Sequence, residues 1–123
     1  MTSITIPDVP LSTNQLERIH WAAKKKMRSR LAWDLRFALL AIEYPVPRDL
    51  AEVRPSKMRV KIRAYRKRRL DPDNAYGGVK VILDAMRDVG ILRNDSPKWL
   101  DLEVEQFIDG KNLRTEIDFE PIR

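Results

Sequence analysis

The chain has no cysteine, one histidine and no long apolar segment. Disulfides and thiolate-held zinc or iron–sulfur sites are therefore excluded, and His20 alone cannot form a multi-histidine metal site. Any bound metal would need oxygen ligands. No stretch approaches the ~20 apolar residues that a membrane span requires, and the N-terminus has neither the basic start nor the apolar core of a secretory leader. We therefore expect a cytoplasmic protein that is not bound to a membrane.

Positive charge is in excess, with 24 Lys and Arg residues against 18 Asp and Glu and a net charge of +6. Such a balance favours polyanionic partners without identifying one. Hydrophobic residues make up 43% of the chain, which is ordinary for a folded protein. A length of 123 residues corresponds to one domain, so we assign residues 1–123 to a single domain.

Hydrophobic patterning predicts an α+β fold with a small mixed sheet in the order β-α-β-α-β-β. The prolines in segment 44–55 predict a loop within the domain. Alternating segments predict strands, and apolar residues every three or four positions predict helices. The expected elements are a strand at 3–6, a long helix at 14–43, a strand at 57–65, a helix across 79–90, and a hairpin formed by strands 99–107 and 113–119.

Three basic segments are candidates for DNA contact. Strand 57–65 carries four cations on one face, but acidic residues alternate along 99–107, so cross-strand ion pairs would use up this stripe if the two strands share a sheet. Lys24, Lys25 and Lys26 on the long helix fit either a solvated face or nucleic-acid contact. The run "RKRR" is the best candidate, because four adjacent cations repel unless a polyanion or acidic cluster is near. Its residues are Arg66, Lys67, Arg68 and Arg69.

The segment "DPDNAYGG" begins one residue after this basic run, beyond Leu70, and fits either a helix cap or a metal site. As a cap, Asp73 or Asn74 would begin the next helix and Asp71 would complement its dipole. Capping explains Gly77 and Gly78 poorly, because each costs up to ~1 kcal/mol in a helix relative to alanine. Glycines at these positions allow a backbone or a phosphate to approach closely.

As a metal site, Asp71 and Asp73 would project to the same side of an extended segment, with Pro72 limiting its flexibility. Paired carboxylates repel each other unless a divalent cation lies between them, and hard oxygen ligands suit Mg²⁺ or Mn²⁺. Asp95 is the preferred third carboxylate, since it lies in a loop beyond the helix stop. Asp84 is ranked second, because Lys80 can pair with it at i,i+4 on the helix surface.

The stretch "RRLDPDNAYGGVKVILDAMRDVGILRND" resembles the core motif of the RusA family of Holliday-junction resolvases, which are phage and prophage endodeoxyribonucleases. That family has D-x-D-N, a lysine, an aspartate, a glycine and a closing acidic doublet. Asn94 stands at the first position of the doublet here, leaving Asp95 as the matching carboxylate. The matching residues are Asp71, Asp73, Asn74, Lys80, Asp84, Gly90 and Asp95.

The resemblance implies a homodimer that cuts symmetric strands of a four-way DNA junction with Mg²⁺, for which Mn²⁺ could substitute. It implies metal binding and catalysis by Asp71, Asp73 and Asp95, with Lys80 neutralising the phosphate. The basic run 66–69, and secondarily residues 24–26, would hold the DNA backbone. Two alternatives remain open: a non-catalytic DNA-binding protein with the same fold, and a nuclease for flaps or other branched DNA.

Overall fold

The computed structural model describes residues 1–7, 11–45 and 57–122 and confirms an α+β fold. Most of the loop expected at 44–55 lies outside the described residues, as do residues 8–10 of "PDVP". No helix within the described part of the chain is long and apolar enough to cross a membrane. The elements in chain order are β1 (Thr2–Ile6), α1 (Thr13–Glu17), α2 (Trp21–Ala41), β2 (Lys57–Arg66), α3 (Pro72–Val89), β3 (Leu100–Ile108) and β4 (Arg114–Ile122).

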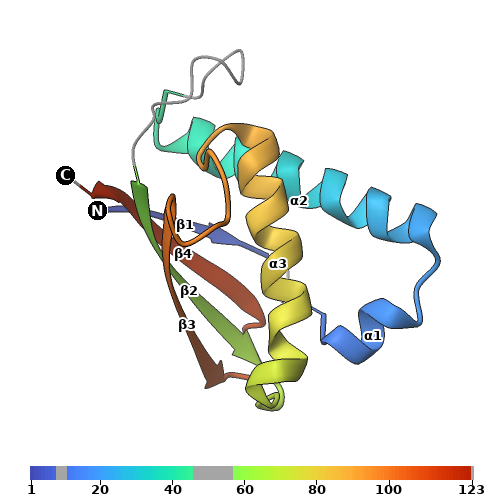
Figure 1. The fold of residues 1–123 in the computed structure, drawn as a ribbon. Helices are drawn as coiled ribbons and strands as arrows, with labels where there is room; N and C mark the ends of the chain where they lie inside the picture. The colour runs from blue at the N-terminus through green and yellow to red at the C-terminus, as the bar shows by residue number, and fades with distance from the viewer. Residues whose placement is uncertain (8–10, 46–56, 123) are drawn as a thin grey trace.

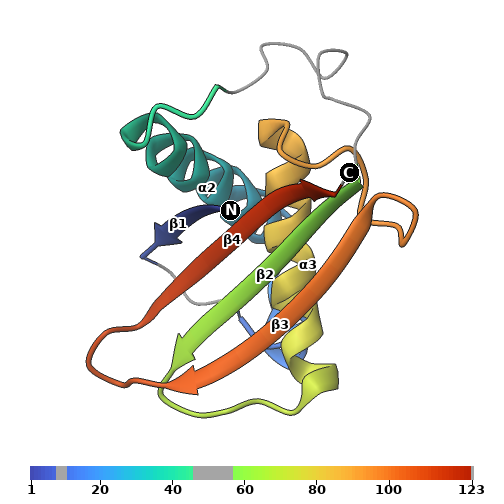
Figure 2. The same ribbon diagram turned by 90° about the vertical axis from the view of Figure 1, so that its left-hand side faces the viewer.

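The four strands form one mixed sheet in the order β1-β4-β2-β3. Strand β4 pairs antiparallel with both β1 and β2, whereas β3 pairs parallel with β2. Helices α2 and α3 cover one face of the sheet, and the opposite face is open (Figures 1 and 2). Parallel neighbours require a crossover connection, and α3 provides it between β2 and β3. The acidic motif consequently lies where β2 ends and α3 begins.

The core forms between the sheet and the two long helices. Alternate residues of β2 and β4 point toward the helices, as the period of a strand requires. Apolar residues of α2 and α3 meet them from the other layer, which fixes both helices against the sheet. The apolar side chains in this layer that are at most 1% exposed are Ile6, Leu35, Leu39, Val60, Ile62, Ala64, Ile82, Ala85, Met86, Leu92, Ile117 and Phe119.

The expected hairpin between the last two strands is wrong, because β2 lies between β3 and β4. The turn predicted at 109–112 does connect them, but it crosses the end of β2, where the Asp109 N–H donates to the Arg66 carbonyl at 2.9 Å. Charge accounts for the arrangement. The outward residues of β3 and β4 are mostly acidic, and like charges on directly paired strands would repel. The basic strand β2 separates them.

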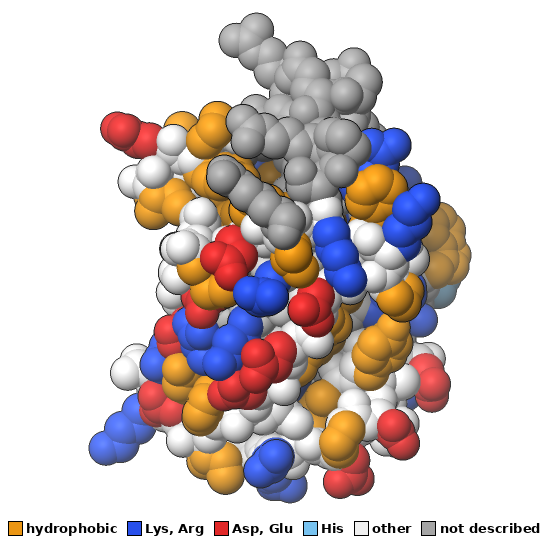
Figure 3. Space-filling view, turned by 60° about the vertical axis from the view of Figure 1, so that its left-hand side comes forward, with side chains coloured by type: hydrophobic (Ala, Val, Ile, Leu, Met, Phe, Trp, Pro, Cys, Tyr) orange, Lys and Arg blue, Asp and Glu red, His pale blue; other side chains and the backbone are white. Residues whose placement is uncertain are grey.

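Cross-strand ion pairs on the open face confirm that the basic stripe of β2 is used within the sheet. Arg59 reaches Glu120 on β4 at 3.2 Å and Asp101 on β3 at 3.8 Å. Lys61 contacts Glu105 at 2.8 Å. Arg63 forms a two-pronged pair with Asp118, which holds the pKa of that carboxyl below its usual value. Figure 3 shows the basic and acidic side chains interleaved on this side of the molecule.

The helix expected at 14–43 is divided into α1 and α2. Ser12 begins α1 with a reciprocal capping box to Gln15. His20 then has extended backbone angles and caps α2, its Nδ1 accepting from the Ala22 N–H at 3.2 Å. Apolar periodicity does not reveal such a break, because Leu16 and the buried residues of α2 still point toward the core. The observed order is therefore β-α-α-β-α-β-β.

Close contact between α1 and α3 explains Gly77. A Cβ atom at this position would lie 2.7 Å from Thr13 Oγ1, 3.0 Å from Thr13 Cα and 3.2 Å from Leu16 Cδ1. Distances this short require the neighbouring atoms to move. The glycines were expected to allow close approach of either a backbone or a phosphate. At Gly77 the structure shows close approach of the α1 backbone at Thr13.

We predict that Gly77→Ala destabilises the protein by about 1–3 kcal/mol, as overpacking of a tight contact does. Helix propensity alone would make the alanine variant more stable by up to ~1 kcal/mol. The sign of the change in unfolding free energy therefore shows whether propensity or steric overpacking dominates. Urea unfolding measures the change. Gly110→Ala is the matched control, because its Cβ would meet only Lys67 Cγ at 3.8 Å. Equal or greater stability of Gly77→Ala would contradict the proposed contact.

Candidate functional site

Two exposed carboxylates lie at the N-terminus of α3. Asp71 is the N-cap residue, with extended angles of φ −60° and ψ 147°, but its side chain makes no capping hydrogen bond. Pro72 begins the helix, a position at which its fixed φ is favourable. Asp73 lies in the first helical turn, where a negative charge complements the dipole. The structure corrects two expectations: Asp73 and Asn74 are not the N-cap, and Asp73 is not in an extended segment.

The N-termini of α1 and α3 are locked together by side chains. The Thr13 hydroxyl donates to the Asp73 carbonyl and accepts from the Gly77 N–H, both at 3.0 Å. The Asn74 side-chain oxygen accepts from the Asn14 N–H at 3.0 Å. The Asn14 N–H lies in the first turn of α1, where backbone donors have no partner within the helix. The Thr13 hydroxyl instead bridges the Asp73 carbonyl and the Gly77 N–H, which stand four residues apart in α3. These bonds fix the turn that carries Asp73, and they give Asn74 a positioning role.

Lys80 and Asp95 form an ion pair, with 3.4 Å between Nζ and Oδ2. The expected pair between Lys80 and Asp84 is wrong, because Asp84 lies 3.9 Å from Arg87 on the same helix. The loop after α3 thus folds back onto the helix. It meets α3 at Lys80, seven residues and about 10 Å along the axis from Asp73. Lys80 and Asp73 share one side of α3, since seven residues make two turns.

The oxygen ligands of the predicted metal site suit Mg²⁺ in type, but the three predicted carboxylates are not grouped together. Among the described residues, no three His, Cys, Asp or Glu side chains are grouped to hold a metal ion. Asp71 and Asp73 alone remain chemically suitable, since Mg²⁺ often binds one or two carboxylates and completes its shell with water and substrate phosphate. Asp95 can join them only if its ion pair with Lys80 is exchanged.

The basic run divides into one buried and three exposed side chains. Arg66 is 8% exposed, and burial lowers the pKa of its guanidinium, so it is not on the surface as the DNA-binding prediction requires. Lys67, Arg68 and Arg69 are exposed in the connection to α3. Three exposed cations therefore lie within a few residues of Asp71.

Gln106 of β3 holds this basic connection in place. Its side-chain oxygen accepts from the Leu70 N–H at 3.0 Å, and its side-chain nitrogen donates to the Leu70 carbonyl at 2.9 Å. Gln106 was not among the predicted site residues, although the sequence carries a signal for this role. It interrupts the apolar alternation of Leu100, Leu102 and Val104, as a polar residue with a specific partner would.

A hollow of about 450 Å³ lies between α3 and β3, beside the acidic motif. Tyr76 is 58% exposed on the helix, and Val104 is 39% exposed on the strand. Neither was predicted as a site residue, although an aromatic residue next to two glycines in the motif is a usable signal. The lining is formed by Arg69, Pro72, Ala75, Tyr76, Val79, Val104, Glu105 and Gln106.

The three lysines predicted as secondary DNA contacts, Lys24, Lys25 and Lys26, are exposed in the first half of α2. Their positions are compatible with either a solvated face or binding to an anionic partner. They belong to a different helix from the acidic motif.

Comparison of the sequence with protein-family models and with curated proteins found no match. Assignment of function therefore depends on the geometry of the site and on the motif itself.

We predict that Arg68→Gln with Arg69→Gln weakens binding to every DNA tested. On duplex DNA, the log–log salt slope should fall by roughly 0.9 for each phosphate that the variant no longer neutralises. Fluorescence anisotropy at several salt concentrations measures both quantities. The control is Arg59→Gln with Lys61→Gln, because these cations pair within the sheet and should leave the slope unchanged. A slope unaltered by the Arg68 and Arg69 changes would exclude them from DNA contact.

Proposed function

We propose that the protein is a Mg²⁺-dependent endodeoxyribonuclease of the RusA type, which acts as a homodimer on four-way DNA junctions. The observation that carries the proposal is the exposed Asp71 carboxylate. It stands at an N-cap but makes no capping bond, so helix capping does not account for it. Asp73 lies two residues further on, and exposed Arg68 and Arg69 precede both acids.

In this proposal, Asp71 and Asp73 hold the cation from the rigid end of α3. Bound Mg²⁺ supplies positive charge that stabilises the negative charge developing on the scissile phosphate. The side chains of Thr13 and Asn74 keep the first turn of α3 in place, so that both carboxylates are presented in a fixed geometry. Preorganisation of this kind matters because small displacements of catalytic groups are costly in rate.

Lys80 neutralises phosphate charge in the proposed complex. In the free protein its ammonium group contacts Asp95. A DNA phosphate would compete for that ammonium group and thereby release Asp95. In this proposal, a phosphate replaces Asp95 as the partner of Lys80. Lys80 would then contact the phosphate, and Asp95 would be free to act as the third carboxylate.

The exposed cations Lys67, Arg68 and Arg69 supply sequence-independent attraction for DNA. Contacts with phosphates position a protein on DNA but carry no base information. Recognition by shape is what a four-way junction requires. Flaps and other branched DNA present similar backbones, so they are the alternative substrates.

The second candidate is a DNA-binding protein without nuclease activity. It is favoured by the Lys80–Asp95 ion pair, because a carboxylate paired with a lysine can serve structure alone. It is also favoured by the lack of a three-ligand group among residues 1–7, 11–45 and 57–122. Divalent-dependent cleavage distinguishes the two candidates.

We predict that Asp71→Asn or Asp73→Asn lowers junction cleavage by at least about 100-fold, because the charge that holds the metal is removed. Junction binding should remain within a fewfold of wild type, since phosphate contacts supply it. Gel assays with and without Mg²⁺ measure cleavage and binding. Asp101→Asn, which changes an exposed acid on the sheet, should cut normally. Wild-type cleavage by both motif variants would exclude the metal site.

The roles of Asp95 and Asp84 separate in the same assay. We expect Asp95→Asn to be as inactive as Asp71→Asn and Asp84→Asn to retain measurable cleavage, because Asp84 pairs with Arg87 on the helix. Thermal melting checks that both variants fold. A folded but inactive Asp84→Asn, together with an active Asp95→Asn, would reverse the assignment.

A further inference from the structure

Helix α2 has a second side that the described chain leaves exposed. Lys26, Arg30, Trp33, Phe37 and Leu40 follow at spacings of four, three, four and three, so they form a stripe along one side of the helix. We call these five residues the outer stripe. The buried residues Leu31, Leu35 and Leu39 occupy the opposite side.

The C-terminal half of the outer stripe is apolar and exposed. Trp33 is 55% exposed, Phe37 64% and Leu40 72%. The Trp33 and Phe37 rings lie 6.1 Å apart, and the Arg36 guanidinium lies 5.1 Å from the Trp33 ring centre. Single exposed apolar residues are ordinary, but a contiguous apolar group marks an interaction site. A helix with apolar residues on both sides is typical of one covered on both sides.

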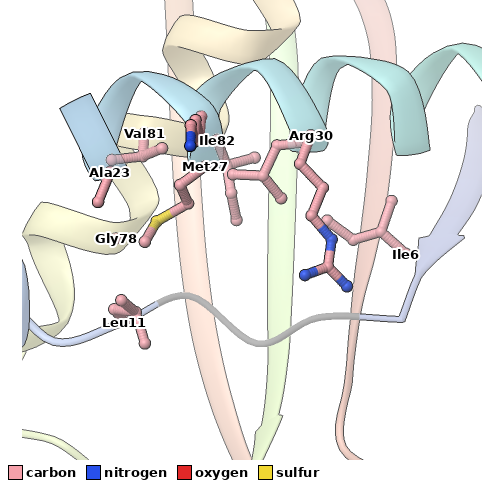
Figure 4. A pocket seen from close by; sticks show the side chains of 10 residues that line it. Ile6, Leu11, Ala23, Met27, Arg30, Gly78, Val81 and Ile82 are labelled. Carbon is pink, nitrogen blue, oxygen red and sulfur yellow. The ribbon is translucent and has the colours of Figure 1, made fainter.

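The N-terminal half of the outer stripe borders a cavity of about 360 Å³ between α2, α3 and the end of β1. Apolar side chains form most of its wall, including Met27, Val81 and Ile82 (Figure 4). Lys26 and Arg30 contribute cationic groups to the same lining. The volume is within the range of small-ligand sites and exceeds that of one large apolar side chain.

Charge along α2 restricts what can cover this side. Asp34 is its one acidic residue, whereas Lys24, Lys25 and Lys26 crowd the first half. The helix dipole adds positive potential at the same end. A ligand that covers the whole stripe must therefore be acidic at the end over Lys26 and apolar at the end over Leu40.

A second copy of the chain meets this requirement poorly. An antiparallel pair of α2 helices centred on Trp33 would place Lys26 opposite Leu40, and a parallel pair would place cations opposite cations. A pair centred on Phe37 would cover the apolar half alone and leave the cationic half and the cavity unused.

We propose that the outer stripe and the adjoining cavity bind an amphipathic helical segment of another protein, with acidic residues at one end and large apolar residues at the other. The acidic end lies over Lys26, and one apolar side chain enters the cavity. The apolar end packs on Trp33, Phe37 and Leu40, in the helix-in-groove mode of recognition.

A fluorescein-labelled synthetic peptide of this pattern, with leucines at helical spacing and four glutamates at one end, tests the proposal by anisotropy. We expect saturable binding to the wild-type protein. Phe37→Ala should weaken binding about tenfold or more, as removal of an aromatic anchor does. Ala23→Trp, which places a large side chain in the cavity lining, should weaken it similarly. Ile108→Ala, at a 72% exposed position on β3, is the matched control and should have no effect.

Three results would overturn the proposal. The first is equal binding of a matched peptide with lysines in place of the glutamates, which would show that charge complementarity between the peptide and the outer stripe does not contribute. The second is unchanged peptide binding by both Phe37→Ala and Ala23→Trp, with folding verified by thermal melting. The third is a wild-type dimer that Phe37→Ala converts to a monomer in light scattering, which would assign the stripe to a second copy. The outer stripe and the acidic motif lie on different helices, so the outcome is independent of nuclease activity.

Discussion

The parallel pairing of β2 with β3 is the constraint on which the rest of the structure depends. Parallel neighbours cannot be joined by a tight turn, so the chain must return along the sheet through α3. The basic connection and the acidic motif thereby come together at the carboxyl end of β2. Ligands commonly bind at this edge in open sheets with crossover helices. The lock between Thr13 and Gly77 then fixes the first turn of α3.

Electrostatics divides the cations of the molecule into two groups. Arg59, Lys61 and Arg63 on β2 pair with acids of the neighbouring strands, and Arg63 lowers the pKa of Asp118 by direct hydrogen bonding. Lys67, Arg68 and Arg69 continue from the same strand but project beyond it, next to Asp71. Cations that pair with acids of a neighbouring strand stabilise the sheet, whereas the exposed three are available to an external polyanion. The same sequence of charges therefore serves the fold in one segment and the proposed interface in the next.

The sequence predicted the fold class, all four strands and the strand-to-helix position of the acids, because short-range patterns determine them. Ion pairs between 57–65 and 99–107 were expected if the two strands share a sheet, and Lys61–Glu105 is one of them. The pairs of Arg59 and Arg63 with β4 were not predicted. The sequence did not predict the strand order. The turn at 109–112 favoured a hairpin. The charge pattern instead indicates the observed order, because 99–107 and 113–119 both alternate with acidic residues and 57–65 alternates with basic ones, which favours placing 57–65 between them. The Lys80–Asp95 pair depends on how a loop folds back, and the burial of Arg66 depends on the connection clamped by Gln106. Local sequence carries no direct signal for either.

Cleavage of a labelled four-way junction by the wild-type protein, with flap and linear duplex DNA as parallel substrates, would decide whether the chain is a junction nuclease. We expect paired incisions in the four-way junction that require Mg²⁺, with weaker cutting of the other two. Chelation with EDTA should abolish cleavage and leave binding. Tight junction binding without incision in either Mg²⁺ or Mn²⁺ would contradict the proposed activity and identify a DNA-binding protein that is not a nuclease.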